Sequence, residues 1–133
     1  MNAVNEALYD RLTGDAPLMA LLGARGVYHA LAPQPTEHEF LVYGKQQAVD
    51  QYTQGARAGR NLLYFVKMVG LGLSVVEAET IMEAVDAALT DVPLTITGWT
   101  NSYIRRVADI EYAEEYNGRV YQHIGATWEL EIV

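Results

Sequence analysis

The chain has 133 residues, which suits one domain with a single hydrophobic core, and half of them are apolar, which excludes a disordered chain. The net charge of −8 disfavours specific binding to the phosphate backbone of nucleic acid. Because the sequence has no cysteine, no signal-peptide pattern and no apolar run of about 18 residues, we expect an intracellular site of synthesis, without disulfides, zinc–cysteine sites or membrane spans.

Two short helices are expected at the N-terminal end of the chain. Val4, Leu8 and Leu12 recur every four residues and therefore form one face of a first helix. Asp15 is placed to cap a second helix, which Gly23 ends.

Compact apolar runs and a long polar stretch follow these helices. The polar stretch covers residues 44–61, is rich in glutamine and glycine, has no apolar period and carries Lys45, Arg57 and Arg60. We expect it to be a flexible loop that is poorly ordered in the free protein. The apolar runs predict three strands, near residues 27–32, 40–44 and 62–69.

A longer helix is expected over residues 74–89. Ser74 and Glu77 form an S-x-x-E capping box at its start, and apolar side chains then recur at spacings of three and four. This apolar stripe predicts that the helix packs on one face of the sheet.

The opposite stripe of the same helix is acidic and has no basic residue four positions away. Two interpretations of this stripe are open. The acids form a solvated helix face, or they contact a neighbouring subunit through the basic side chains of residues 44–61. The candidate interface under the second interpretation consists of Lys45, Arg57, Arg60, Glu79, Glu83 and Asp86.

The C-terminal part of the chain predicts a hairpin whose register has two possible solutions. A two-residue turn at Asn117-Gly118 sets Glu111 against Ile124, whereas a shift by one residue sets Tyr112 against Ile124 and matches polarity on both faces. We expect the second register, produced by a bulge or a three-residue loop at the turn, with Trp128 and Tyr112 in the core. Strands are expected near residues 94–97, 103–116 and 119–133.

These elements predict the fold class. The chain is expected to be α+β, a single domain over residues 1–133 with a mainly antiparallel sheet. One central helix should pack on a face of that sheet, and short helices should lie at the N-terminal end.

The sequence offers no motif that carries catalysis or ligand binding. Gly70-Leu71-Gly72 lies between a strand and a helix, but Val75 stands where a dinucleotide fingerprint needs its third glycine. Glu37-His38-Glu39, together with His29 and His123, lacks the spacing of a metal site. We therefore expect no catalytic, cofactor-binding or metal-binding residues and no enzymatic activity.

Several blocks of the sequence, taken in order, resemble the tail-completion proteins of long-tailed bacteriophages, which are also called tail terminator or tail-to-head joining proteins. The resemblance spans nearly the whole chain, and it departs from the family at residues 37–39 and in the variable stretch 45–61. The blocks that carry it include ALYDRL (7–12), DAPLMALLG (15–23), FLVYG (40–44), AETI (78–81) and NGR (117–119).

The resemblance implies a structural protein of the virion. Such proteins form a ring, usually a hexamer, that caps the head-proximal end of the tail tube and joins it to the head connector. The resemblance also implies assembly in the cytoplasm of a bacterial host, no catalytic residues and no cofactor. An excess of acidic residues suits a ring through which DNA passes without binding. The alternatives are a head–tail connector or neck adaptor protein and, less in line with the sequence, a small-ligand-binding domain or enzyme.

Overall fold

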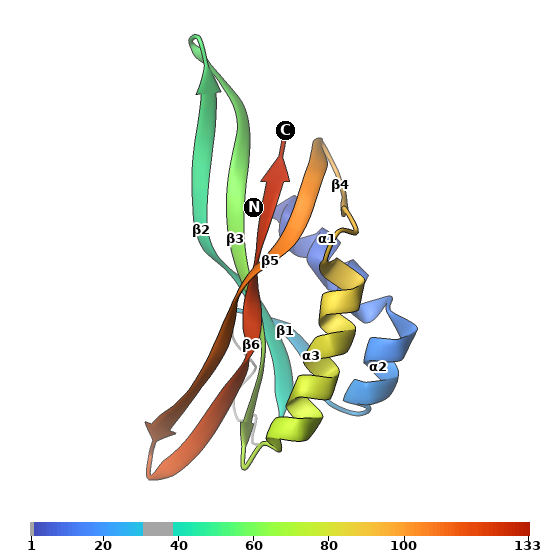
Figure 1. The fold of residues 1–133 in the computed structure, drawn as a ribbon, viewed down its shortest axis with the longest axis vertical. Coiled ribbons are helices and arrows are strands. Elements are labelled where there is room, and N and C mark those ends of the chain that lie inside the picture. Colours follow the sequence, from blue (N-terminus) through green and yellow to red (C-terminus); the bar gives the residue numbers. More distant parts are fainter. Residues whose placement is uncertain (1, 31–38) are drawn as a thin grey trace.

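A curled six-stranded sheet carries three helices on one of its faces (Figure 1). The computed structural model describes residues 2–30 and 39–133. Among these residues no helix is long and apolar enough to cross a membrane. The elements in chain order are α1 (Asn2–Thr13), α2 (Ala16–Leu22), β1 (Val27–His29), β2 (Phe40–Thr53), β3 (Ala56–Leu71), α3 (Val75–Leu89), β4 (Thr95–Ile96), β5 (Trp99–Tyr116) and β6 (Arg119–Ile132).

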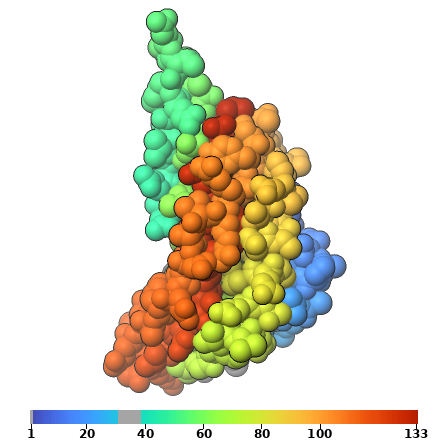
Figure 2. All heavy atoms as spheres, viewed as in Figure 1, coloured from blue at the N-terminus to red at the C-terminus, as the bar shows by residue number. Residues whose placement is uncertain are grey.

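The sheet consists of two long hairpins joined side by side. Its strand order is β1-β2-β3-β6-β5-β4, and only the pair of β1 and β2 is parallel. The β2–β3 hairpin and the β5–β6 hairpin extend from opposite ends of the molecule (Figure 1). Figure 2 shows the outer part of the β2–β3 hairpin as a narrow arm that projects beyond the packed body. The prediction of an α+β domain with a mainly antiparallel sheet is confirmed.

The prediction that residues 44–61 form a loop is wrong. These residues form the outer halves of β2 and β3, which pair up to Thr53 and Ala56 and turn at Gln54-Gly55. Most side chains of this arm are exposed on both faces, so the segment has no apolar period for sequence analysis to detect. Backbone pairing, and not burial, defines these strands.

The three predicted helices are confirmed, and so are the N-caps Asp15 and Ser74, whereas the Glu77 side chain forms an ion pair with Arg25. Asp15 accepts a hydrogen bond from the Leu18 amide at 2.9 Å, and Ser74 accepts one from the Glu77 amide at 3.4 Å. The C-terminal end of α3 is held from a distance, because the Arg11 guanidinium donates to the carbonyl oxygens of residues 88, 92 and 93 at 2.7–2.9 Å. This contact ties α1 to α3.

The hairpin of β5 and β6 has the register that we did not expect. At the turn, Glu111 lies opposite Ile124, and both Asn117 and Gly118 have positive φ, as a tight two-residue turn requires. The register shifts farther from the turn, between Arg106 and Ala108 of β5, so the expected bulge exists but lies about ten residues from the turn. The bulge returns the apolar side chains of β5 to the helix-covered face, where Ile104 is buried.

The core lies between the sheet and the helices, and Trp128 is its largest fully buried side chain, as predicted. Trp128 lies opposite Tyr64 on β3, and its indole N–H donates to the Thr90 hydroxyl at 3.0 Å. The prediction that Tyr112 joins the core is wrong. Tyr112 is 44% exposed and stacks on His123 on the other face of the sheet, because the register at the turn differs by one residue.

Truncation of Trp128 tests the core. Trp128→Ala removes a side chain that is 1% exposed, so the free energy of unfolding should fall by about 3–5 kcal/mol, measured by urea denaturation. Glu131→Ala is the matched control on the opposite face of β6 and should change it by about 0.5 kcal/mol at most. Equal losses in the two variants would contradict the strand alternation.

Candidate assembly interface

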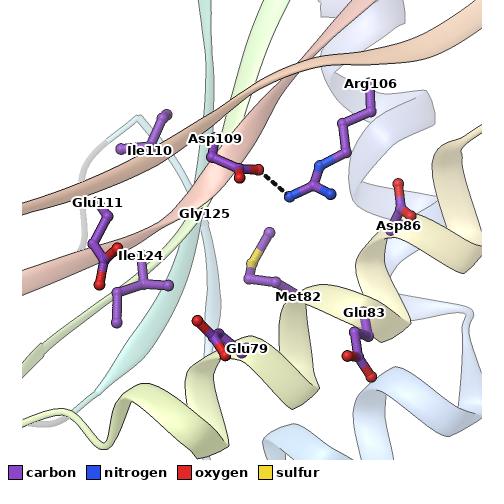
Figure 3. Close-up of a pocket in the computed structure, with 10 residues that line it drawn as sticks. All are labelled: Glu79, Met82, Glu83, Asp86, Arg106, Asp109, Ile110, Glu111, Ile124 and Gly125. Carbon is purple, nitrogen blue, oxygen red and sulfur yellow. Dashed lines mark hydrogen bonds and ion pairs between the residues drawn. The ribbon is translucent and has the colours of Figure 1, made fainter.

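The three predicted acids of α3 line one groove, which lies between α3 and β5 and has a volume of about 240 Å³. Figure 3 shows the side chains of both walls around this groove. The wall on β5 adds two carboxylates that sequence analysis did not connect with those of α3, because the pairing of β5 was assigned to the wrong register. The charged residues that line the groove are Glu79, Glu83, Asp86, Arg106, Asp109 and Glu111.

The groove has more negative charge than its own partners neutralise. Arg106 forms an ion pair with Asp109, and Asp86 accepts a hydrogen bond from the Thr90 hydroxyl. Among the described residues, Glu79, Glu83 and Glu111 have no hydrogen-bond or ion-pair partner. The groove is therefore suited to a positively charged side chain.

The three predicted basic residues lie on the projecting arm, on β2 and β3. The Arg60 Nε atom lies 2.6 Å from Asp50 Oδ1, and Arg57 lies 3.7 Å from the same oxygen and 5.7 Å from the centre of the Trp99 ring. Lys45 is exposed and has no such partner among the described residues. Arg57 and Arg60 are thus partly satisfied within the subunit, and Lys45 is the freest of the three.

Within the described part of the subunit, no ion pair joins the basic set to the acidic set. A contact between the two sets would have to form between subunits. That interpretation of the six residues stays a prediction.

Among the described residues, the sheet has two unpaired edges on opposite sides. Strand β1 pairs only with residues 41–43 of β2, so among the described residues the β2 edge (residues 44–53) has no strand beyond it. Strand β4 pairs only with residues 99–100 of β5, and Asp91 N–H donates to the Ile104 carbonyl. The β5 edge (residues 105–116) is likewise unpaired in the described structure.

Both edges carry exposed apolar side chains. Val49 and Tyr52 of the β2 edge are 48% and 70% exposed, and Val107 and Tyr116 of the β5 edge are 53% and 65% exposed. Unpaired backbone groups beside exposed apolar side chains are typical of a surface that pairs with another chain. These edges were not predicted from the sequence, because an edge is a property of strand order and cannot be recognised from one strand alone.

The described residues among those considered for a metal site are not brought together. Glu39 forms an ion pair with Arg25 at 2.9 Å, the His29 ring lies beside Tyr43, and His123 lies on the uncovered face of the sheet. Glu37 and His38 lie outside the described residues. Within residues 2–30 and 39–133, no group of acidic and histidine side chains is arranged to hold a metal ion.

His123 is buried without a hydrogen bond to either ring nitrogen. Its ring stacks on Tyr112 at a centroid distance of 4.3 Å, and its Nε2 atom lies 3.7 Å from a Glu114 oxygen. Burial lowers the pKa of His123 below its usual value, and the nearby Lys67 ammonium lowers it further, against the opposing effect of Glu114.

The lowered pKa predicts a pH dependence of stability. The unfolded chain binds a proton at His123 near pH 6.5, whereas the folded protein binds it only at lower pH, so the free energy of unfolding should fall as pH decreases through that window. His123→Phe keeps an aromatic ring against Tyr112 and removes the titration. Urea denaturation at several pH values between about 7.5 and 5 should show a steeper fall in the free energy of unfolding for the wild type than for the variant. The same pH dependence in both proteins would contradict the lowered pKa of His123.

Comparison with known proteins finds a matching family and solved chains of similar fold. Residues 6–124 match the family model of tail completion protein gp17. A solved chain described as part of the virion of a native gene transfer agent (GTA) particle is 20% identical, with a TM-score of 0.80 over 98% of this chain and 95% of that one. A second solved chain is 13% identical, with a TM-score of 0.61 over 97% and 94% of the two chains. At such identities the likeness establishes the fold. A search of the curated proteins finds no match.

Proposed function

The chain belongs to the tail completion protein gp17 family and is a structural protein of the phage tail, and we propose that it forms a ring on the head-proximal end of the tail tube. The ring, a homo-hexamer, ends polymerisation of the tube and provides the joint to the head connector. Assembly takes place in the cytoplasm of the bacterial host.

The main support for a ring is that one sheet has two different edges on opposite sides, both unpaired in the part of the chain that the structure describes. A contact between two unlike surfaces of the same chain leaves one free surface at each end of a growing assembly. Such head-to-tail contacts end only when the rotation between subunits closes a ring. A twofold dimer, in contrast, uses the same surface on both subunits and leaves the other edge exposed.

The distribution of charge supports a ring through which DNA passes. Residues 77–133 contain eleven acidic and three basic side chains, which accounts for the whole net charge of −8. An acidic surface repels the phosphate backbone, so DNA can move past it without being held.

Tube capping is the direct test. Purified protein added to polymerising tail tube protein should shorten the tubes and leave a ring at one end of each, as seen by negative-stain electron microscopy. Binding to the head connector with no effect on tube length would instead identify a neck adaptor, which is the alternative function.

The acidic groove should contribute to assembly through charge. Glu79→Lys with Glu83→Lys should reduce ring formation without lowering the thermal unfolding temperature, because both side chains are exposed and have no partner within residues 2–30 and 39–133. Ring formation by the wild type should weaken as salt rises past about 0.15 M, where surface charges are screened beyond about 8 Å.

A matched control separates the groove from net charge. Glu6→Lys with Asp10→Lys makes the same change in net charge on exposed positions of α1 and should leave ring formation unchanged. Normal rings from the Glu79→Lys, Glu83→Lys variant would return the acidic stripe of α3 to a solvated helix face.

A further inference from the structure

We propose that neighbouring copies of this chain join by antiparallel pairing of the β2 edge of one copy with the β5 edge of the next, so that one sheet continues around the ring. This inference rests on the proposed ring. Strands β2, β3, β6 and β5 are successively antiparallel, so β2 and β5 run in opposite directions. Copies related by rotation about the ring axis keep this relation, and the new pair is therefore antiparallel.

Each edge is covered by another strand at one end, and this determines how neighbouring copies are displaced along the strand direction. Strand β1 covers the start of β2 and β4 covers the start of β5, and these positions lie at opposite ends of the sheet (Figure 1). The free stretches can therefore meet only if neighbouring copies are displaced along the strand direction. Strands in closed sheets tilt by roughly 35–45° to the axis, which produces such a displacement in a closed ring.

The charged side chains of both edges limit the possible registers. Lys45 lies opposite Tyr64, whose side chain is in the core, so Lys45 points to the helix-covered side of the sheet. On the β5 edge, Asp109 and Glu111 line the groove on that same side, and strand alternation places Glu115 there as well. Three antiparallel registers consequently place Lys45 beside an acid on the same side.

Asp50 distinguishes these three registers. It lies opposite Arg60 on the helix-covered side of β2, five residues after Lys45. Pairing Lys45 with Asp109 would set Asp50 against the buried Ile104. Pairing Lys45 with Glu115 would set Asp50 against Glu111, because β2 has one extra residue between Lys45 and Gln47. The first arrangement places a carboxylate against a buried apolar side chain and the second places two acids opposite each other, so both of these registers are disfavoured.

The remaining register pairs Lys45 with Glu111 and Asp50 with Arg106, and both pairs have opposite charge. Arg106 lines the groove with Glu111, so the four side chains share one side of the sheet. Each edge has a register shift inside this stretch, after Lys45 on β2 and after Arg106 on β5, so the two contacts are separated by one irregularity on both strands.

Two further features fit this register. It sets Val49 opposite Ala108, beside Val107, and Val49 and Val107 are 48% and 53% exposed in the free subunit and would come together in the ring. It also brings the unpartnered Lys45 of one copy to the groove of the next, where Glu79 and Glu83 have no partner among the described residues. The pairing thus supplies the cation that the groove lacks.

Disulfide cross-linking tests the register directly, since the chain has no cysteine of its own. Facing residues of an antiparallel pair have Cα atoms about 4.5–5.5 Å apart, within the range that a disulfide spans. Mild oxidation of the K45C/E111C variant should give a ladder of covalent multimers on a non-reducing gel, ending at the ring. The K45C/E115C variant, which represents another register, should give no ladder. A ladder from K45C/E115C alone, or dimers from K45C by itself, would overturn the proposal.

A charge exchange provides a second test without cysteines. Lys45→Glu should lower the association constant between subunits about tenfold, because it sets two acids against each other in every contact. Lys45→Glu combined with Glu111→Lys should restore it, whereas Lys45→Glu combined with Glu115→Lys should not. If wild-type rings cap tubes but neither the cross-link nor the rescue occurs, edge pairing in this register is wrong and the proposed function stands. If the wild type forms no ring and caps no tube, both fail.

Discussion

The pairing of β3 with β6 is the contact on which the rest of the molecule depends. It runs from Arg60 opposite Ile132 to Leu71 opposite Tyr121 with no register shift, whereas both hairpins contain shifts. Tyr64 and Trp128 face each other within it, and each is almost fully buried. Because this pair joins the two hairpins, it fixes at once the direction of both projecting tips and the positions of both unpaired edges.

The same pairing connects the core with the acidic groove. The Trp128 indole cannot be buried without a hydrogen-bond acceptor, and the Thr90 hydroxyl provides it at 3.0 Å. That hydroxyl donates in turn to Asp86, one of the carboxylates that line the groove. Arg11 holds the adjacent end of α3 through backbone carbonyls. The wall of the groove on α3 is therefore fixed by the core, while the carboxylates of Glu79 and Glu83 have no partner in the described part of the chain.

The sequence predicts those parts of the fold in which burial and local chemistry agree. The caps at Asp15 and Ser74 and the alternation around Trp128 were sufficient to predict the helices and the last strand. The arm over residues 44–61 could not be recognised, because strands that are exposed on both faces have no hydrophobic alternation. The hairpin register was mispredicted because a bulge near Val107 corrects the polarity far from the turn, and no local signal marks its position. The acids of α3 were identified as a group, but the opposite wall of the groove depends on that register.

An unpaired edge allows a free subunit to pair with strands of other chains and to aggregate. The charges and bulges of the two edges, which would specify the ring, also disfavour such pairing. A β5 edge paired with a second β5 edge would bring together two strands that each contain four acids between Ala108 and Tyr116, and their repulsion opposes it. Two β2 edges offer only Lys45 and Asp50 as charges, and Asp50 is already engaged by Arg57 and Arg60. The register shifts on both edges further disfavour a regular ladder with an arbitrary strand. Pairing of unlike edges, in contrast, brings opposite charges together. The same charges and bulges that disfavour the other pairings of subunits therefore favour the pairing that would close a ring.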